Sequence, residues 1–185
     1  RSYQVCGFPP PSSGAIAVGQ ILGILGNTPA AQMPLGTDGL PTADWLHFYT
    51  EASRLAFADR ALYVADPDFV QAPGDSWMNL LDNRYLKERS SLIGQQSMKV
   101  AQAGNPAKFK VSHAPMPDQI EYGTSHISIV DAFGNALAMT TTIEDQFGSR
   151  QMVKGFLLNN ELTDFSMLPK AADGIRLHHF QMKTS

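Results

Sequence analysis

A threonine that follows a glycine at the start of an expected β-strand is the residue in this sequence best placed to do chemistry. Gly123 and Thr124 stand at the head of a run rich in β-branched residues. Here the threonine hydroxyl can attack the carbonyl of the preceding glycine, and an N-to-O acyl shift followed by hydrolysis leaves a new N-terminal threonine. Its free α-amino group, with an ordinary pKa of about 7.7–8.0, can then serve as the base for the hydroxyl. Glycine at position 123 leaves room around the tetrahedral intermediate because it has no Cβ.

Taken alone, Gly-Thr-Ser is more often a turn that enters a strand than a cleavage site. The wider pattern changes this interpretation: the chain runs GTSHxSxVDxxGNAxxxTTTIExxFGS and then GFLLNNELTDFS. This order resembles the γ-glutamyltranspeptidase family, and Pro9–Gly14 resembles that family's PPPSSG segment. The resemblance extends over most of residues 3 to 168. It implies an α+β fold of the N-terminal-nucleophile hydrolase type, with stacked α, β, β and α layers and largely antiparallel sheets.

The resemblance also implies roles for individual residues. Thr124 corresponds to the nucleophile exposed by cleavage after Gly123, and Thr142 to a threonine that hydrogen-bonds to it and supports self-processing. Three acidic residues and one amide correspond to substrate-binding positions: Glu144, Asn160, Glu161 and Asp164.

The acidic positions are expected to hold the α-amino group of a γ-glutamyl substrate, because carboxylates form strong charge-assisted hydrogen bonds with an ammonium group. Without the motif, two acids in a polar loop would be interpreted as solvated surface. Glu144 stands where well-studied members of the family more often have asparagine. A further carboxylate would attract the ammonium end of a substrate and repel a carboxylate end.

The resemblance implies that residues 1–123 correspond to the C-terminal part of a large subunit and residues 124–185 to the N-terminal part of a small subunit, in one shared fold. The expected partners are therefore the remaining parts of both parent subunits. The family's arginine for the substrate carboxylate and its later Gly-Gly oxyanion element have no counterpart in these residues. Because oxyanion donors are often the largest catalytic contribution, we expect this polypeptide alone to be nearly inert toward substrate.

The expected parent activity is γ-glutamyl transfer from glutathione or a related amide to water or an amino acceptor, through an acyl-enzyme on Thr124. An acylase of the same fold that hydrolyses another side-chain amide is the alternative that Glu144 favours. A third possibility, from a different class, is an unprocessed fragment without turnover. A serine-hydrolase arrangement in which His126 is the base and Asp131 orients it is less favoured, because the resemblance assigns the base to the amine.

A hairpin is predicted between residues 126–130 and 136–143. A three-residue loop, Ala132-Phe133-Gly134 with glycine in the left-handed conformation, would pair Asp131 with Asn135 and place Thr124 opposite Thr142. A loop of two or four residues would place the two threonines on opposite faces. We predict the three-residue loop.

The rest of the chain is expected to be helical with irregular connections. A short strand is predicted over Tyr3–Phe8, and residues 94–119 lack periodicity and are expected to form an exposed connector. Three helices are predicted: a buried one beginning near Gly14 and including Ile16–Leu25, an amphipathic one from Thr42 to about Tyr63, and a short one around Asn83–Ile93 capped by Asn83 or Asp82. In the amphipathic helix, Glu51, Arg54, Asp59 and Arg60 are expected on the faces away from the apolar stripe.

Composition narrows the function classes. The formal charge of −3, from 14 basic and 17 acidic residues without blocks, predicts no nucleic-acid partner. No apolar run is long enough for a membrane span. Cys6 is the only cysteine, which is compatible with a bacterial periplasm or cytoplasm, so the compartment stays open. No cofactor motif is present, and the adjacent His178 and His179 without a third ligand predict no metal site.

Overall fold

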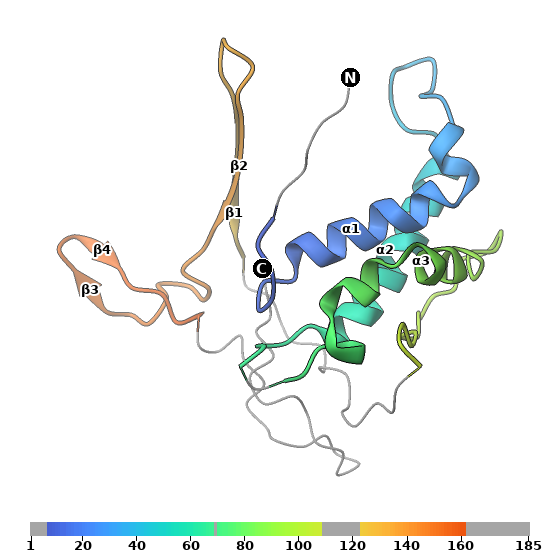
Figure 1. Ribbon diagram of the computed structural model, residues 1–185. Helices are drawn as coiled ribbons and strands as arrows, with labels where there is room; N and C mark the ends of the chain where they lie inside the picture. The colour runs from blue at the N-terminus through green and yellow to red at the C-terminus, as the bar shows by residue number, and fades with distance from the viewer. Residues whose placement is uncertain (1–6, 69, 109–122, 162–185) are drawn as a thin grey trace.

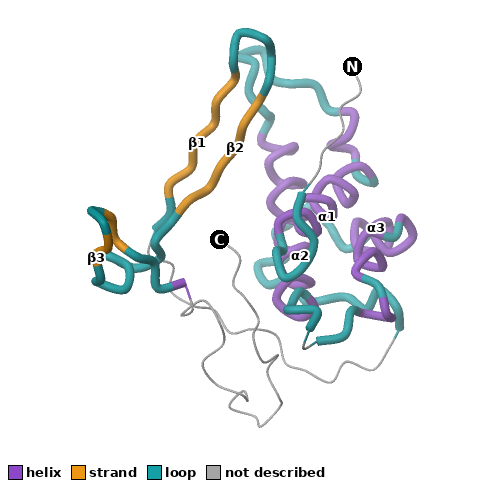
Figure 2. Tube along the Cα trace, turned by 60° about the vertical axis from the view of Figure 1, so that its left-hand side comes forward, coloured by secondary structure: helices purple, strands orange, loops and turns teal. Residues whose placement is uncertain are grey.

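The computed structural model describes residues 7–68, 70–108 and 123–161. Three helices lie together, and a β-hairpin stands apart from them in both views (Figures 1 and 2). The described elements are α1 (Gly14–Gly26), η1 (Pro29–Gln32), α2 (Ala43–Tyr63), η2 (Pro73–Asp75), η3 (Trp77–Leu81), α3 (Asn83–Ser90), β1 (Ser125–Val130), β2 (Ala136–Thr141), β3 (Met152–Val153) and β4 (Phe156–Leu157). Nearly all of the predicted strand Tyr3–Phe8, together with Asp164, His178 and His179, lies outside the described residues.

The predicted helices are confirmed, and side chains cap two of them. The Thr42 hydroxyl accepts a hydrogen bond from Trp45 N at 3.2 Å at the start of α2. Asp82, one of the two predicted caps, accepts from the amides of Arg84 and Tyr85 at the start of α3. Such caps satisfy amides that have no partner within the helix.

Helix α3 ends at Ser90, three residues earlier than predicted. The Ser90 hydroxyl donates to Lys87 O and the Ser91 hydroxyl donates to Glu88 O. These side chains occupy carbonyls near the end of the helix, and the following amides of Leu92 and Ile93 bond three residues back, in the tighter 3₁₀ pattern.

The apolar core lies where the three helices meet. Ile24 of α1 and Leu55 of α2 are fully buried, and Leu86 of α3 packs against the same cluster. Gly23 allows this approach, because a Cβ at that position would lie 2.5 Å from Leu86 Cδ1. A side chain at this position would require Leu86 to move from its place in the core.

Two acidic residues of α2 are buried, so their predicted placement on outer faces is wrong. Glu51 and Asp59 are 1% and 0% exposed. Glu51 accepts hydrogen bonds from Met98 N and the Ser97 hydroxyl and is paired with Arg54. A buried carboxylate is tolerated when hydrogen-bond donors replace water. Ser97 and Met98 lie outside α2, so the amphipathic pattern of the helix does not reveal them.

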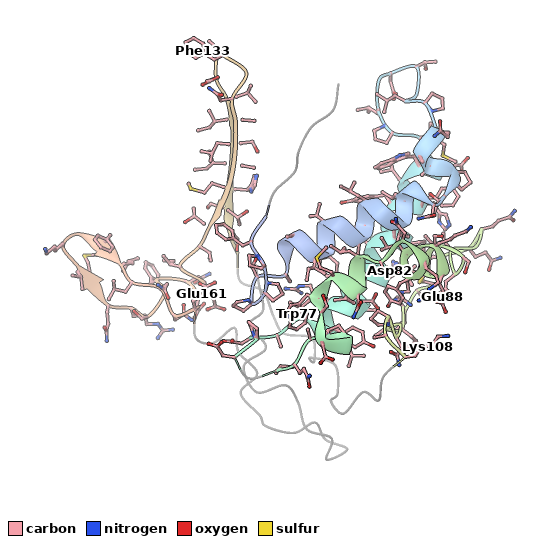
Figure 3. The ribbon with its side chains drawn as sticks, in the orientation of Figure 1. Trp77, Asp82, Glu88, Lys108, Phe133 and Glu161 are labelled. Atoms are coloured by element: carbon pink, nitrogen blue, oxygen red, sulfur yellow. The ribbon has the colours of Figure 1, made fainter. Side chains whose placement is uncertain are left out.

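Within the described residues, the strands form two antiparallel two-stranded sheets, β1 with β2 and β3 with β4. The predicted α+β class with antiparallel sheets is therefore confirmed. Every residue of β1 and β2 is exposed, including apolar side chains such as Ile129 and Leu137. Phe133 at the tip of the hairpin is 92% exposed (Figure 3). This hairpin carries no core of its own.

Candidate active site

The candidate site lies at the open end of the β1–β2 hairpin. Ser125 pairs with Thr141, so the next pair in register joins Thr124 with Thr142. At the other end, Asp131 N donates to Asn135 O and Gly134 has φ 85°. The predicted three-residue loop and its register are thus confirmed, and the two threonines face one another across the hairpin.

The Thr142 hydroxyl donates to the carbonyl oxygen of Gly123 at 3.0 Å. This carbonyl belongs to the peptide bond that Thr124 would attack. A donor at this position withdraws electron density from the carbonyl carbon and stabilises the negative charge that develops on the oxygen. The contact is therefore suited to an acyl shift at the Gly123–Thr124 bond.

Gly123 is favoured at this position by its backbone conformation. Its φ of 142° lies in a range that residues with a side chain rarely adopt. Apart from its chain neighbours, the described residues place no heavy atom within 4 Å of the position where a Cβ would stand, so crowding by them is not the reason. The exposed carbonyl and the exposed Thr124 leave the bond open to attack.

A cavity of about 280 Å³ adjoins this peptide bond, lined by residues 123–125 and 141–147. Glu144 is part of this lining, and its amide donates to the Thr142 hydroxyl at 2.9 Å. Glu144 has φ 73°, and its carboxylate accepts a hydrogen bond from the side-chain amide of Asn160. The structure thus brings together five of the predicted site residues: Gly123, Thr124, Thr142, Glu144 and Asn160.

Glu161 follows Asn160 directly and lies at the foot of the hairpin (Figure 3). Its amide donates to the Asn159 side chain at 3.1 Å, and its side chain is partly exposed. Glu144 and Glu161 therefore lie at the two ends of the segment that follows β2 and contains β3 and β4.

His126 and Asp131 do not form the alternative catalytic pair. The His126 ring nitrogens contact the hydroxyls of Thr140 and Ser128 at 2.8 and 3.1 Å. The Asp131 carboxylate is occupied in the turn, where the side chain and amide of Asn135 donate to it and lower its pKa. The predicted preference against this arrangement agrees with the geometry.

A second polar centre, which the sequence pattern did not predict, lies among the helices. The Asp59 carboxylate accepts hydrogen bonds from Gln20, Tyr85, Arg89 and Gly104 at 2.7–3.0 Å. Burial raises the pKa of Asp59, although the positive charge of Arg89 opposes this change. The donors lie on α1, on α3 and in the segment after α3, so the hydrogen bonds to Asp59 connect α1, α2 and α3.

Two further observations apply to residues 7–68, 70–108 and 123–161. No group of three or more His, Cys, Asp or Glu side chains there is arranged to hold a metal ion. No helix within these ranges has both the length and the apolar character needed to cross a membrane.

The α+β fold, with Thr124 directly after Gly123 and directly before β1, is of the N-terminal-nucleophile hydrolase type. The gamma-glutamyltranspeptidase family model matches residues 1–183. The chain belongs to this family. It is 37% identical to the glutathione hydrolase proenzyme of Bacillus subtilis (strain 168) over 95% of the chain, and 34% identical to the acylase ACY 1 proenzyme of Pseudomonas sp. (strain SE83) over 93%.

Among solved structures, the cephalosporin acylase from Bacillus halodurans matches 94% of the chain with a TM-score of 0.61 and 26% identity. The chain spans 30% of the length of the Bacillus subtilis relative, 28% of the Pseudomonas acylase and 28% of the Bacillus halodurans structure. The match therefore extends over nearly the whole chain and about a third of each relative.

Proposed function

We propose that this chain carries the self-cleavage site and nucleophile of an enzyme that transfers γ-glutamyl groups to water or to an amino acceptor. The observation that supports this most strongly is the hydrogen bond from Thr142 to the Gly123 carbonyl. It lies on the one peptide bond that must break for Thr124 to become an N-terminal nucleophile. The Bacillus subtilis relative is named a glutathione hydrolase proenzyme. The word proenzyme agrees with the proposed processing, and glutathione agrees with the proposed substrate class.

In the proposed cleavage, a bond forms between Thr124 Oγ1 and the Gly123 carbonyl carbon while the carbon–nitrogen bond breaks. The hydroxyl proton is transferred to the departing nitrogen, which becomes the α-amine of Thr124. Water then hydrolyses the ester and releases the Gly123 carboxylate. Thr142 supports the step by donating to the oxygen that carries the negative charge.

After cleavage, the Thr124 amine takes up the proton of its own hydroxyl as the oxygen attacks the carbonyl carbon of a substrate amide. The carbon–nitrogen bond of that amide breaks, the proton passes to the departing amine, and water or an amino acceptor then removes the acyl group from Thr124. The departure of Gly123 frees the Thr142 hydroxyl to interact with Thr124 or with the substrate. Glu144, Glu161 and Asp164 would bind the substrate ammonium group, which attracts carboxylates through charge-assisted hydrogen bonds.

The proposed division is residues 1–123 from a large subunit and residues 124–185 from a small subunit. The full exposure of β1 and β2 supports further partners, because apolar side chains on both faces of a hairpin are normally covered. We propose that strands of the remaining parent subunits cover them.

The acylase alternative is supported by two observations. The Pseudomonas relative and the Bacillus halodurans structure are both named acylases, and Glu144 lines the cavity beside the cleavage site. An acylase would accept amides without an α-ammonium group, and Glu144, which stands where the family more often has asparagine, is the position at which such a change of substrate preference is expected.

Trapping the acyl group on Thr124 distinguishes these functions. The cleaved chain, together with the remaining parts of both parent subunits, would be incubated with a γ-glutamyl anilide or with the matching glutaryl anilide, which lacks the ammonium group, and digested for mass spectrometry. We expect an adduct on the peptide beginning at Thr124 from the γ-glutamyl donor alone. An adduct from the glutaryl donor alone indicates the acylase. No adduct from either, with the other subunit parts added, contradicts both functions.

A further inference from the structure

Asn160 holds the segment that follows Thr142 by three hydrogen bonds. Its amide nitrogen donates to Ile143 O at 3.3 Å, and its side-chain oxygen accepts from Asp145 N at 3.0 Å. Its side-chain nitrogen donates to the carboxylate of Glu144. Three consecutive residues are thus fixed by one asparagine located about fifteen positions later in the chain.

The central residue of this segment has a backbone conformation that needs such support. Glu144 has φ 73°, in the left-handed region that residues with a side chain disfavour. A conformation of this kind persists only when its surroundings hold it in place. The bonds from Asn160 to both neighbours and to the Glu144 side chain supply that restraint.

The conformation of Glu144 in turn sets the direction of the Thr142 hydroxyl. This hydroxyl has one proton to donate and lone pairs to accept. It accepts from Glu144 N at 2.9 Å, so its proton is left to point at the Gly123 carbonyl oxygen at 3.0 Å. A Glu144 amide that turned away would allow the hydroxyl to rotate off the scissile bond.

We propose that Asn160 is a positioning residue for self-cleavage, acting through the Glu144 amide on the Thr142 hydroxyl. This role rests on the proposed function. It also differs from the substrate-binding role that the family resemblance implies for Asn160, because both polar atoms of its side chain are directed to its own loop. The loop closed by Asn160 is then part of the processing machinery.

The action of Asn160 on Glu144 can be tested by reversing the direction of the hydrogen bond between their side chains. Asn160→Asp keeps the acceptor for Asp145 N but sets a carboxylate against Glu144, and we expect cleavage to slow roughly tenfold to a hundredfold. Adding Glu144→Gln restores a bond in the opposite direction, from the glutamine amide to the new aspartate, and should recover most of the rate. Asn159→Asp is the matched control, because it adds the same charge at the exposed neighbouring asparagine and should cleave like the original chain.

A Thr142→Val chain separates a positioning role of Asn160 from a general loss of stability. If Asn160 acts through Thr142, then Asn160→Asp should change the residual cleavage rate little in a Thr142→Val chain, where the hydroxyl is already gone. A full additional loss in that background, or no recovery in the Glu144→Gln double variant, would overturn the proposal. Equal cleavage of Asn160→Asp and the original chain would do the same.

Hydrogen exchange keeps the inference separate from the proposed function. If the original chain does not cleave, the self-processing proposal fails. The three hydrogen bonds from Asn160 to residues 143–145, called the Asn160 clamp, are then tested by the exchange of the Glu144 amide in NMR spectra. We expect Asn160→Asp to accelerate this exchange at least tenfold, while the Asn135 amide in the hairpin turn is unchanged. Unchanged exchange at Glu144 would overturn the clamp whatever the cleavage result.

Discussion

The helical region, residues 7–68 and 70–108, and the hairpin region, residues 123–161, are stabilised in different ways. The helical region has an apolar core and, beside it, a carboxylate with four donors, Asp59. The hairpin region exposes both of its long strands. Its order comes from hydrogen bonds over short sequence distances, such as those of the Asp131 turn and the Asn160 clamp.

This difference shows that the residues proposed for chemistry are positioned locally. The contacts from Asn160 to Glu144, from Glu144 to Thr142 and from Thr142 to Gly123 all lie within the hairpin region. None of them requires the helical core. A change in one region should therefore leave the other largely intact.

The largest effect on stability is expected from removing the centre of the helical region. Asp59→Ala leaves Arg89 buried without its carboxylate, which should cost about 3–5 kcal/mol in the free energy of unfolding. Urea denaturation followed by helical circular dichroism measures this. Asp131→Ala, the same substitution in the exposed hairpin turn, is the control and should leave the helical transition unchanged. A similar urea midpoint for the original and the Asp59→Ala chains would contradict the claim that the hydrogen bonds of Asp59 stabilise the packing of the three helices.

The second effect concerns the chemistry of the hairpin region. Thr142→Val removes the donor to the Gly123 carbonyl and should slow cleavage by about 10²–10³-fold, the usual effect of losing one oxyanion donor. Thr142→Ser keeps the hydroxyl and should retain most of the rate. Thr140→Val, two residues earlier on β2 and bonded to His126, should have a much smaller effect. Equal loss in the valine variants at positions 140 and 142 would mean that strand stability, not the donor, controls cleavage.

High pH should loosen the helical region first. Burial, together with the negative charge of Asp59, raises the pKa of Tyr63 from 10.0 to about 12. The neutral phenol is therefore favoured in the folded state, and the stability it contributes is complete below pH 10 and is lost as the pH rises toward 12. Thermal melts across this window should show the loss, and Tyr63→Phe should reduce its slope. An unchanged slope in Tyr63→Phe would assign the effect to other groups.

Low pH should act on the hairpin region, with a smaller effect. Hydrogen bonds from the Asn135 side chain and amide lower the pKa of Asp131 below 3.8. The stabilisation is thus present above the ordinary carboxyl pKa and is lost as the pH falls through the lowered value. NMR shifts of the Asn135 amide should report this loss. If Asp131→Asn gives the same pH profile, the turn does not depend on this charge.

The hairpin and its register could be predicted because their determinants are local. Gly134 supplies the left-handed residue that a three-residue loop requires, and the alternating β-branched residues identify the strands. The starts of α2 and α3 could likewise be predicted from Thr42 and Asp82, because a capping side chain accepts from backbone amides within three residues of itself. The three-residue loop was predicted in preference to loops of two or four residues because the family resemblance implies that Thr124 and Thr142 lie together.

The buried polar centre and the clamp could not be predicted in this way. Asp59 meets Gln20 and Arg89, which are 39 and 30 positions away, and the helical pattern of α2 contains no sign of either. Asn160 was singled out only through the family resemblance, as an expected substrate-binding position, and the loop geometry is what reveals its hydrogen bond to Glu144. Taken without the resemblance, an asparagine at this place is compatible with a simple turn.

The most direct test of the central claim is the intact mass of the purified chain during prolonged incubation at neutral pH, compared with Thr124→Ala. The account predicts that the original chain separates into residues 1–123 and 124–185, the second with an N-terminal threonine. Thr124→Ala should keep the mass of the whole chain throughout. An original chain that stays intact under the same conditions, or a Thr124→Ala chain that cleaves at the same bond, would contradict the account.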